Sequence, residues 1–242
     1  MGWLQELGEK IIYVFVEDQR YMYIVKGLRT TAIVTLFALL LGLLIGIIVA
    51  VIRTAHDQMQ ESKRGGVAGF FLGVLNTICR LYLTIIRGTP TMVQLLLMFF
   101  VFLASSNNKV GVAILTFGIN SGAYVAEIFR SGIMSIDKGQ MEAGRSIGLG
   151  YAKTMQRIIL PQAVKNVLPA LVNEMITLLK ETSICGYIGL NDLTRGADII
   201  RGITFEALLP LLAAAAIYLI IVMFFTWVMG KLERRLRESD NR

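Results

Sequence analysis

The sequence predicts an all-α integral membrane protein with five core transmembrane helices. Its 242 residues are 55% hydrophobic and 17% charged, whereas soluble chains average roughly 45–50% and about 25%. Two stretches carry no charge, 23 residues between Arg29 and Arg53 and 24 residues between Glu206 and Lys231. Crossing the hydrocarbon core of a bilayer takes about 20 apolar residues, so each stretch can form a span.

The apolar segments predict the domain organisation. The five spans are expected at about residues 27–52, 90–104, 110–136, 162–184 and 207–230. Residues 1–26 are predicted to be an amphipathic extracytoplasmic lead-in, residues 27–230 the transmembrane domain, and residues 231–242 a charged cytosolic tail. Residues 67–86 carry Asn76, Arg80 and Thr84, and Arg87 follows directly, all at helical spacing. This pattern predicts an amphipathic helix before the second span, either interfacial or tilted into the membrane.

Two of the spans contain small residues at every fourth position. The first span has Gly42, Gly46 and Ala50, and the third has Gly118, Gly122 and Ala126. Such stripes let a neighbouring membrane helix approach closely, so both are predicted to be packing faces.

The third span also has a polar stripe, made of Asn120, Tyr124, Glu127 and Ser131. A carboxylate near the middle of a bilayer costs roughly 2.5–3.5 kcal/mol, so it usually faces a cavity or a partner. Two interpretations of Glu127 are equally consistent with its position. It faces a substrate cavity, or it lies near the cytoplasmic end of the span and pairs with Arg130.

The fourth span is the least hydrophobic of the five. Its neighbours must screen it from lipid, because it contains Lys165, Asn173, Glu174, Lys180 and Glu181.

The basic residues predict the orientation in the membrane. With five spans, 16 of the 24 lysines and arginines fall on one side and 8 on the other. The positive-inside rule then places the amino terminus outside and the carboxyl terminus in the cytosol. The loop at residues 142–161 is therefore predicted to be cytosolic.

Several functions are not supported by any pattern in the sequence. The basic residues lie at the ends of apolar segments, which argues against nucleic acid binding. One histidine and two distant cysteines do not make a zinc site. No phosphate-binding loop occurs, since Gly230-Lys231 is followed by Leu232. The sequence therefore shows no means of binding ATP through such a loop, and no nucleophile–base pair suggests an enzyme.

The cytosolic loop reads EAGRSIGLGYAKTMQRIILP, and Gly148 and Gly150 divide it into two short predicted helices. It resembles the EAA loop of ABC-transporter permeases, the type I importers that depend on a binding protein. The matching residues are Glu142, Ala143, Gly144, Gly148, Ile158, Leu160 and Pro161. The consensus has alanine where this chain has Gly144, so we expect Gly144→Ala to leave the coupling to ATP hydrolysis intact.

Three further segments resemble the polar amino-acid uptake subfamily. They are RGTPTMVQ at 87–94, GAYVAEIFRSGI at 122–133 and LLKETS at 178–183. The resemblance implies a permease subunit of an ATP-driven importer in a prokaryotic cell membrane, with no cofactor of its own. Two cytosolic ATPase subunits would bind ATP and Mg²⁺, and the two short helices of the loop would dock on them as coupling helices. A second permease copy or homologue would complete the pathway, and an extracytoplasmic solute-binding protein would deliver a polar amino acid.

Seven polar residues of spans two to four are the candidates for the substrate pathway: Gln94, Asn120, Tyr124, Glu127, Asn173, Thr182 and Ser183. The main alternative is a permease for another small solute, such as an osmolyte. A channel or secondary transporter that works alone is a second alternative, although no inverted repeat is visible.

Overall fold

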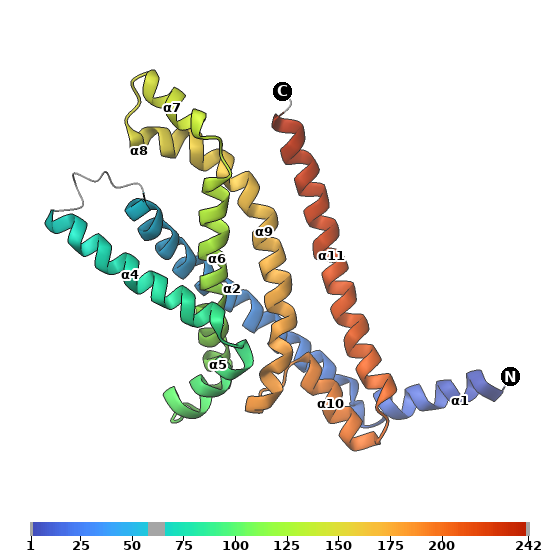
Figure 1. Ribbon diagram of the computed structural model, residues 1–242. Helices are drawn as coiled ribbons and strands as arrows, with labels where there is room; N and C mark the ends of the chain where they lie inside the picture. Colours follow the sequence, from blue (N-terminus) through green and yellow to red (C-terminus); the bar gives the residue numbers. More distant parts are fainter. Residues whose placement is uncertain (1, 58–65, 241–242) are drawn as a thin grey trace. The chain divides into compact units, whose positions relative to one another are not determined.

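The computed structural model describes residues 2–57 and 66–240, and every regular element among them is helical (Figure 1). This confirms the all-α class. In chain order the elements are α1 (Gly2–Ile11), η1 (Ile12–Val16), η2 (Glu17–Gln19), α2 (Tyr21–Asp57), α4 (Val67–Gly88), α5 (Thr91–Leu97), η3 (Met98–Phe102), α6 (Lys109–Met134), α7 (Lys138–Ser146), α8 (Tyr151–Thr154), η4 (Met155–Ile159), α9 (Leu160–Glu181), η5 (Thr182–Ile188), α10 (Leu193–Thr204) and α11 (Leu208–Asp240).

Four helices of the described chain are long and apolar enough to cross a membrane: α2, α4, α6 and α11. Three of them, α2, α6 and α11, cover all or nearly all of the predicted first, third and fifth spans, whereas α9, which covers most of the predicted fourth span, is not among the four. The predicted second span is too short to cross a bilayer core of about 30 Å. Here α5 and η3 together make an apolar helix over Thr91–Phe102, about 18 Å long at 1.5 Å per residue. By contrast α4, predicted to be amphipathic, is a 22-residue helix of sufficient hydropathy. The total of five spans remains a prediction.

The chain divides into two compact units. The first contains residues 1–38, 91–117 and 176–228, and the second contains residues 39–90, 118–175 and 229–242.

In the first unit, α10 lies directly against the amino-terminal part of α2. A Cβ on Gly196 would lie 2.5 Å from the carbonyl oxygen of Tyr23, and one on Gly27 would strike the carbonyl oxygen of Asp192. The hydroxyl of Thr31 accepts a hydrogen bond from the Leu193 N–H, at 3.2 Å. Glycine is needed at both positions because the two backbones touch.

Asp192 caps the start of α10 and is fully buried. Its carboxylate accepts hydrogen bonds from the N–H groups of Thr194, at 2.9 Å, and Arg195, at 3.3 Å. Burial nevertheless raises the pKa of Asp192 from 3.8 to about 6. The folded state therefore holds this proton more tightly than the unfolded chain does. The protonated carboxyl group stabilises the fold fully below about pH 3.8, and this stabilisation is lost as the pH rises through 6.

In the second unit, the two stripes of small residues meet each other. A Cβ on Gly42 would lie 3.0 Å from the Ser121 Cβ, and one on Gly122 would lie 2.9 Å from the Ile45 Cβ. A Cβ on Gly118 would lie 2.6 Å from the Leu41 Cδ2. The prediction that both stripes are packing faces is confirmed, and the partner of each stripe is the other.

The helix α4 packs on this α2–α6 pair. Buried Cys79 and Leu83 of α4 join a cluster with Val49, Ala123 and Ala126. The hydroxyl of Tyr82 donates a hydrogen bond to the Ile119 carbonyl of α6, at 2.5 Å. The second unit is therefore built around a three-helix core.

The tight contact of α10 with α2 leads to a first prediction. Gly196→Ala places a methyl group against backbone that cannot move aside, and we expect it to lower the free energy of unfolding by about 1–3 kcal/mol. Gly202→Ala, also on α10, has open space around it and should raise stability by about 0.5–1 kcal/mol. Thermal unfolding of the purified variants in detergent measures both. Equal midpoints for the two variants would contradict the close contact.

Candidate functional site

The loop between α6 and α9 folds as a helical hairpin, visible beyond the end of α6 in Figure 1. The Asp137 side chain caps α7 by accepting the Gly139 N–H at 2.6 Å. Gly148 has a φ of +85°, and Gly150 is the N-cap of α8. The prediction of two short helices divided by these glycines is confirmed, since glycine tolerates the left-handed conformation that reverses the chain.

Gly144 holds the two arms of the hairpin together. It is buried, and a Cβ on it would strike the Thr154 side chain and lie 3.1 Å from the Ile158 Cδ1. Thr154 is itself fully buried, and its hydroxyl is bonded to the Gly150 carbonyl. The small side chain at 144 thus serves packing within the loop. The expectation that Gly144→Ala is harmless is revised by this contact.

Glu142 and Ala143 lie on the exposed side of the hairpin. No ion pair joins Glu142 to Arg145 among the described residues. The carboxylate of Glu142 and the adjacent methyl of Ala143 are therefore available to a partner protein.

The junction with the membrane helix contains the last residues of the motif. The helix α9 begins at Leu160 with Pro161 in its first turn, where the missing N–H costs least. It follows α8 and the π-helical turn η4 without a break. The second arm of the hairpin and α9 consequently form one continuous helical segment.

The base of the hairpin is fastened between α6 and α9. A Cβ on Gly132 would strike the Val167 side chain, so the two helices are in close contact there. The Asn166 amide donates to the Ser135 hydroxyl at 2.9 Å. The Ser135 hydroxyl in turn donates to the Gly132 carbonyl at 2.8 Å. The base of the hairpin is therefore in contact with both helices.

A second feature of this unit is a group of charged side chains around Glu127, here called the Glu127 cluster. Arg53 of α2 reaches the carboxylate at 3.3 Å, Arg87 of α4 at 3.7 Å, and Arg130 of α6 at 3.6 Å. Arg130 also pairs with Asp57, at 3.6 Å. The local pairing of Glu127 with Arg130 is confirmed, but it is one of three such contacts.

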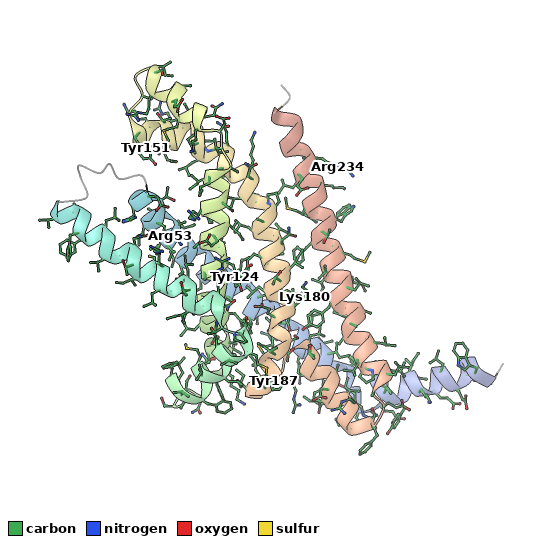
Figure 2. The ribbon with its side chains drawn as sticks, in the orientation of Figure 1. Arg53, Tyr124, Tyr151, Lys180, Tyr187 and Arg234 are labelled. Carbon is green, nitrogen blue, oxygen red and sulfur yellow. The ribbon has the colours of Figure 1, made fainter. Side chains whose placement is uncertain are left out.

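The Glu127 cluster borders a pocket of about 360 Å³. Arg53, Arg80 and Arg87 line it together with Glu127, so cations outnumber the one carboxylate. The Arg87 guanidinium lies 5.7 Å from the centre of the Tyr124 ring, a cation–π distance. Figure 2 labels Arg53 on α2 and Tyr124 on α6. The pocket can accept an anion, or a zwitterion whose ammonium group meets Glu127.

The other predicted pathway residues are distributed over both units. In the second unit Asn120 is buried and Asn173 is exposed. In the first unit Thr182 is buried with its hydroxyl donated to the Leu179 carbonyl at 2.7 Å. Ser183 borders a pocket of about 370 Å³ with Tyr187, Arg195 and Asp198, and Gln94 is half-buried in α5. Tyr124 and Glu127, both in the second unit, have a shared neighbour in Arg87.

Two groups of polar residues were not among the sequence-based candidates. Arg53, Arg80 and Arg87 lie around Glu127, and Glu174 accepts a hydrogen bond from the Ser121 hydroxyl at 2.8 Å. The sequence showed Glu174 as a charge in an apolar span and Arg80 and Arg87 as one helical face. It contained no signal for which other helix they would meet.

Comparison with known proteins gives matches over most of the chain. Residues 65–238 match the family described as binding-protein-dependent transport system inner membrane component. The arginine transport system permease protein ArtQ of Bacillus subtilis is 38% identical, over 72% of this chain and 86% of its own. The glutamine transport system permease protein GlnP of Escherichia coli K12 is 40% identical, over 72% and 83%.

Solved structures agree with the sequence matches. The crystal structure of an amino acid ABC transporter with histidines superposes with a TM-score of 0.78 and 37% identity, covering 91% of this chain and 98% of that one. An inward-facing MetNI methionine ABC transporter has a TM-score of 0.72 at 18% identity, which shows a shared fold.

The buried position of Gly144 leads to a second prediction. In a reconstituted transporter, Gly144→Ala should separate the arms of the hairpin and reduce substrate-stimulated ATP hydrolysis about tenfold, which corresponds to about 1.4 kcal/mol. Gly150→Ala adds the same methyl group in open space and should have a smaller effect. The two variants are compared by ATPase rate with and without loaded binding protein. Full coupling in Gly144→Ala would show that Thr154 moves aside without consequence.

Proposed function

The chain belongs to the family of binding-protein-dependent transport system inner membrane components, and from this premise we propose that it conducts a polar amino acid through the membrane. The proposal is carried by its similarity to permeases named for arginine and glutamine, at 38% and 40% identity. The chain is a membrane transport protein and not an enzyme, and hydrolysis of ATP belongs to a separate subunit. The segments at 87–94, 122–133 and 178–183 resemble the polar amino-acid uptake subfamily, and this supports the same substrate class.

The hairpin α7–α8 is the proposed docking site for a cytosolic ATPase. Exposed Glu142 and Ala143 would meet a groove on the ATPase, where the carboxylate can pair with a basic side chain. Closure of two ATPase subunits on ATP and Mg²⁺ would then move the hairpin as a rigid body. Because the Ser135–Asn166 contact fastens its base, α6 and α9 would follow.

Symmetry and charge support the remaining parts of the proposed importer. A second permease, identical or homologous, would pair with this one. The amino terminus would lie outside and the carboxyl terminus in the cytosol, on the side that holds most lysines and arginines. A solute-binding protein would release the amino acid at the outer side.

The pocket beside the Glu127 cluster is a proposed part of the substrate pathway. Glu127 would meet the α-ammonium group or a cationic side chain, while an arginine meets the α-carboxylate. The three ion pairs of Glu127 would have to rearrange as substrate passes, since they occupy the same carboxylate. Gln94, Asn120, Tyr124, Asn173, Thr182 and Ser183 stay in the proposal as further pathway residues.

The substrate class is tested by reconstituting the chain with its ATPase and binding protein in liposomes. We expect at least one polar amino acid of a labelled panel to be taken up and to stimulate ATP hydrolysis. Stimulation by an osmolyte but by no amino acid would overturn the substrate class. Uptake by the chain alone, without ATPase, would instead favour a channel or secondary transporter.

The role of Glu127 is tested by neutralisation. Glu127→Gln removes the only carboxylate of the pocket lining, and we expect uptake to fall about tenfold, equivalent to about 1.4 kcal/mol. Glu127→Asp keeps the charge and should retain more activity. The matched control is Glu9→Gln at an exposed position. Normal assembly with unchanged uptake and substrate range in Glu127→Gln would remove this residue from the pathway.

A further inference from the structure

A groove of about 530 Å³ lies where the end of α2 faces the first half of α4, both in the second unit. It is separate from the coupling hairpin, and neither the family match nor the relatives' names assign it a role. It shares one residue, Arg80, with the pocket beside the Glu127 cluster. The groove has a polar part and an apolar part.

The polar part of the groove contains groups whose bonding is incomplete. Asn76 is 6% exposed, and its Oδ1 has no hydrogen-bond partner among the described residues. The buried Nδ1 of His56 also has no hydrogen bond among them, although it lies 3.8 Å from the Asp57 carboxylate. Leaving such an atom unpaired costs free energy, so it usually indicates a missing ligand or water. The unpaired Oδ1 of Asn76 calls for a hydroxyl or ammonium donor.

Arg80 supplies an uncommitted positive charge to the same groove. Its neighbours Arg53 and Arg87 each place a terminal nitrogen near Glu127. No ion pair joins Arg80 to a carboxylate in the described part of the chain, and its side chain is exposed. The Arg80 guanidinium is therefore available to pair with a bound anion.

The apolar part of the groove follows one face of α4. Phe70, Val74 and Ile78 succeed one another at intervals of four residues and line the groove. Their exposed fractions are 68%, 42% and 58%. In a helix of sufficient length and hydropathy to cross a membrane, such a face suits hydrocarbon chains.

We propose that this groove binds an anionic phospholipid whose headgroup carries hydroxyls, of the phosphatidylglycerol type. The phosphate pairs with Arg80, a headgroup hydroxyl donates to Asn76, and an acyl chain lies along Phe70, Val74 and Ile78. Basic pockets beside membrane helices attract such headgroups. Free phosphate would satisfy Arg80 but would leave the apolar face uncovered and the Asn76 oxygen without a donor. A zwitterionic choline headgroup offers neither net charge nor a hydroxyl.

The test measures lipid preference and depends on neither the substrate nor the ATPase, so it can fail while the proposed function stands. The purified chain is reconstituted in bilayers with spin-labelled phosphatidylglycerol or phosphatidylcholine, and the motionally restricted fraction of each probe is compared. Wild-type protein should prefer phosphatidylglycerol. Arg80→Gln should reduce that preference about fivefold, the effect of one basic residue near an anionic surface.

Matched variants distinguish a lipid site in this groove from a general effect of positive charge. Arg80→Lys keeps the charge and should keep most of the preference. Arg29→Gln removes an exposed arginine elsewhere on α2 and should behave like wild type. Ile78→Ser should weaken the restricted phosphatidylglycerol component without changing the net charge. An unchanged preference in Arg80→Gln would overturn the proposal. So would displacement of the probe by inorganic phosphate, which would show a site for the free anion.

Discussion

The close approach of α2 to α6 is the constraint on which the second unit depends. Gly42 and Gly122 leave no room for side chains between the two helices, and membrane helices gain most of their association energy from such contact. The α2–α6 pair forms the surface on which Cys79 and Leu83 of α4 are buried. It also sets Arg53 of α2 beside Glu127 of α6, so the charged pocket is a consequence of the packing.

That consequence matters because charges are costly among membrane helices. Glu127 is stabilised by arginines from three helices, an arrangement that survives only if all three helices stay in place. A transporter can use such a group, since the same carboxylate can exchange an internal arginine for a cationic part of its substrate. The extra cation, Arg80, is what makes the adjacent groove suitable for an anionic lipid.

The hairpin α7–α8 shows a different use of small residues. Gly144 is small because Thr154 lies against it, whereas exposed Glu142 and Ala143 are left for a partner. The internal contact holds the two arms together, and the Ser135–Asn166 hydrogen bond joins the base of the hairpin to α9.

The helical class, the membrane setting, the two arms of the hairpin and the family could all be predicted from the sequence, because hydropathy, glycine spacing and a motif of seven residues are local properties. It also predicted that the two glycine stripes are packing faces, but not that each packs on the other. The folded chain was needed to show that Gly144 packs inward, that Glu127 has three arginine partners, and that Asn76, His56 and Arg80 share a groove. These depend on contacts between residues far apart in the chain, such as Arg53 with Glu127, and helical periodicity is the same whichever helix lies opposite.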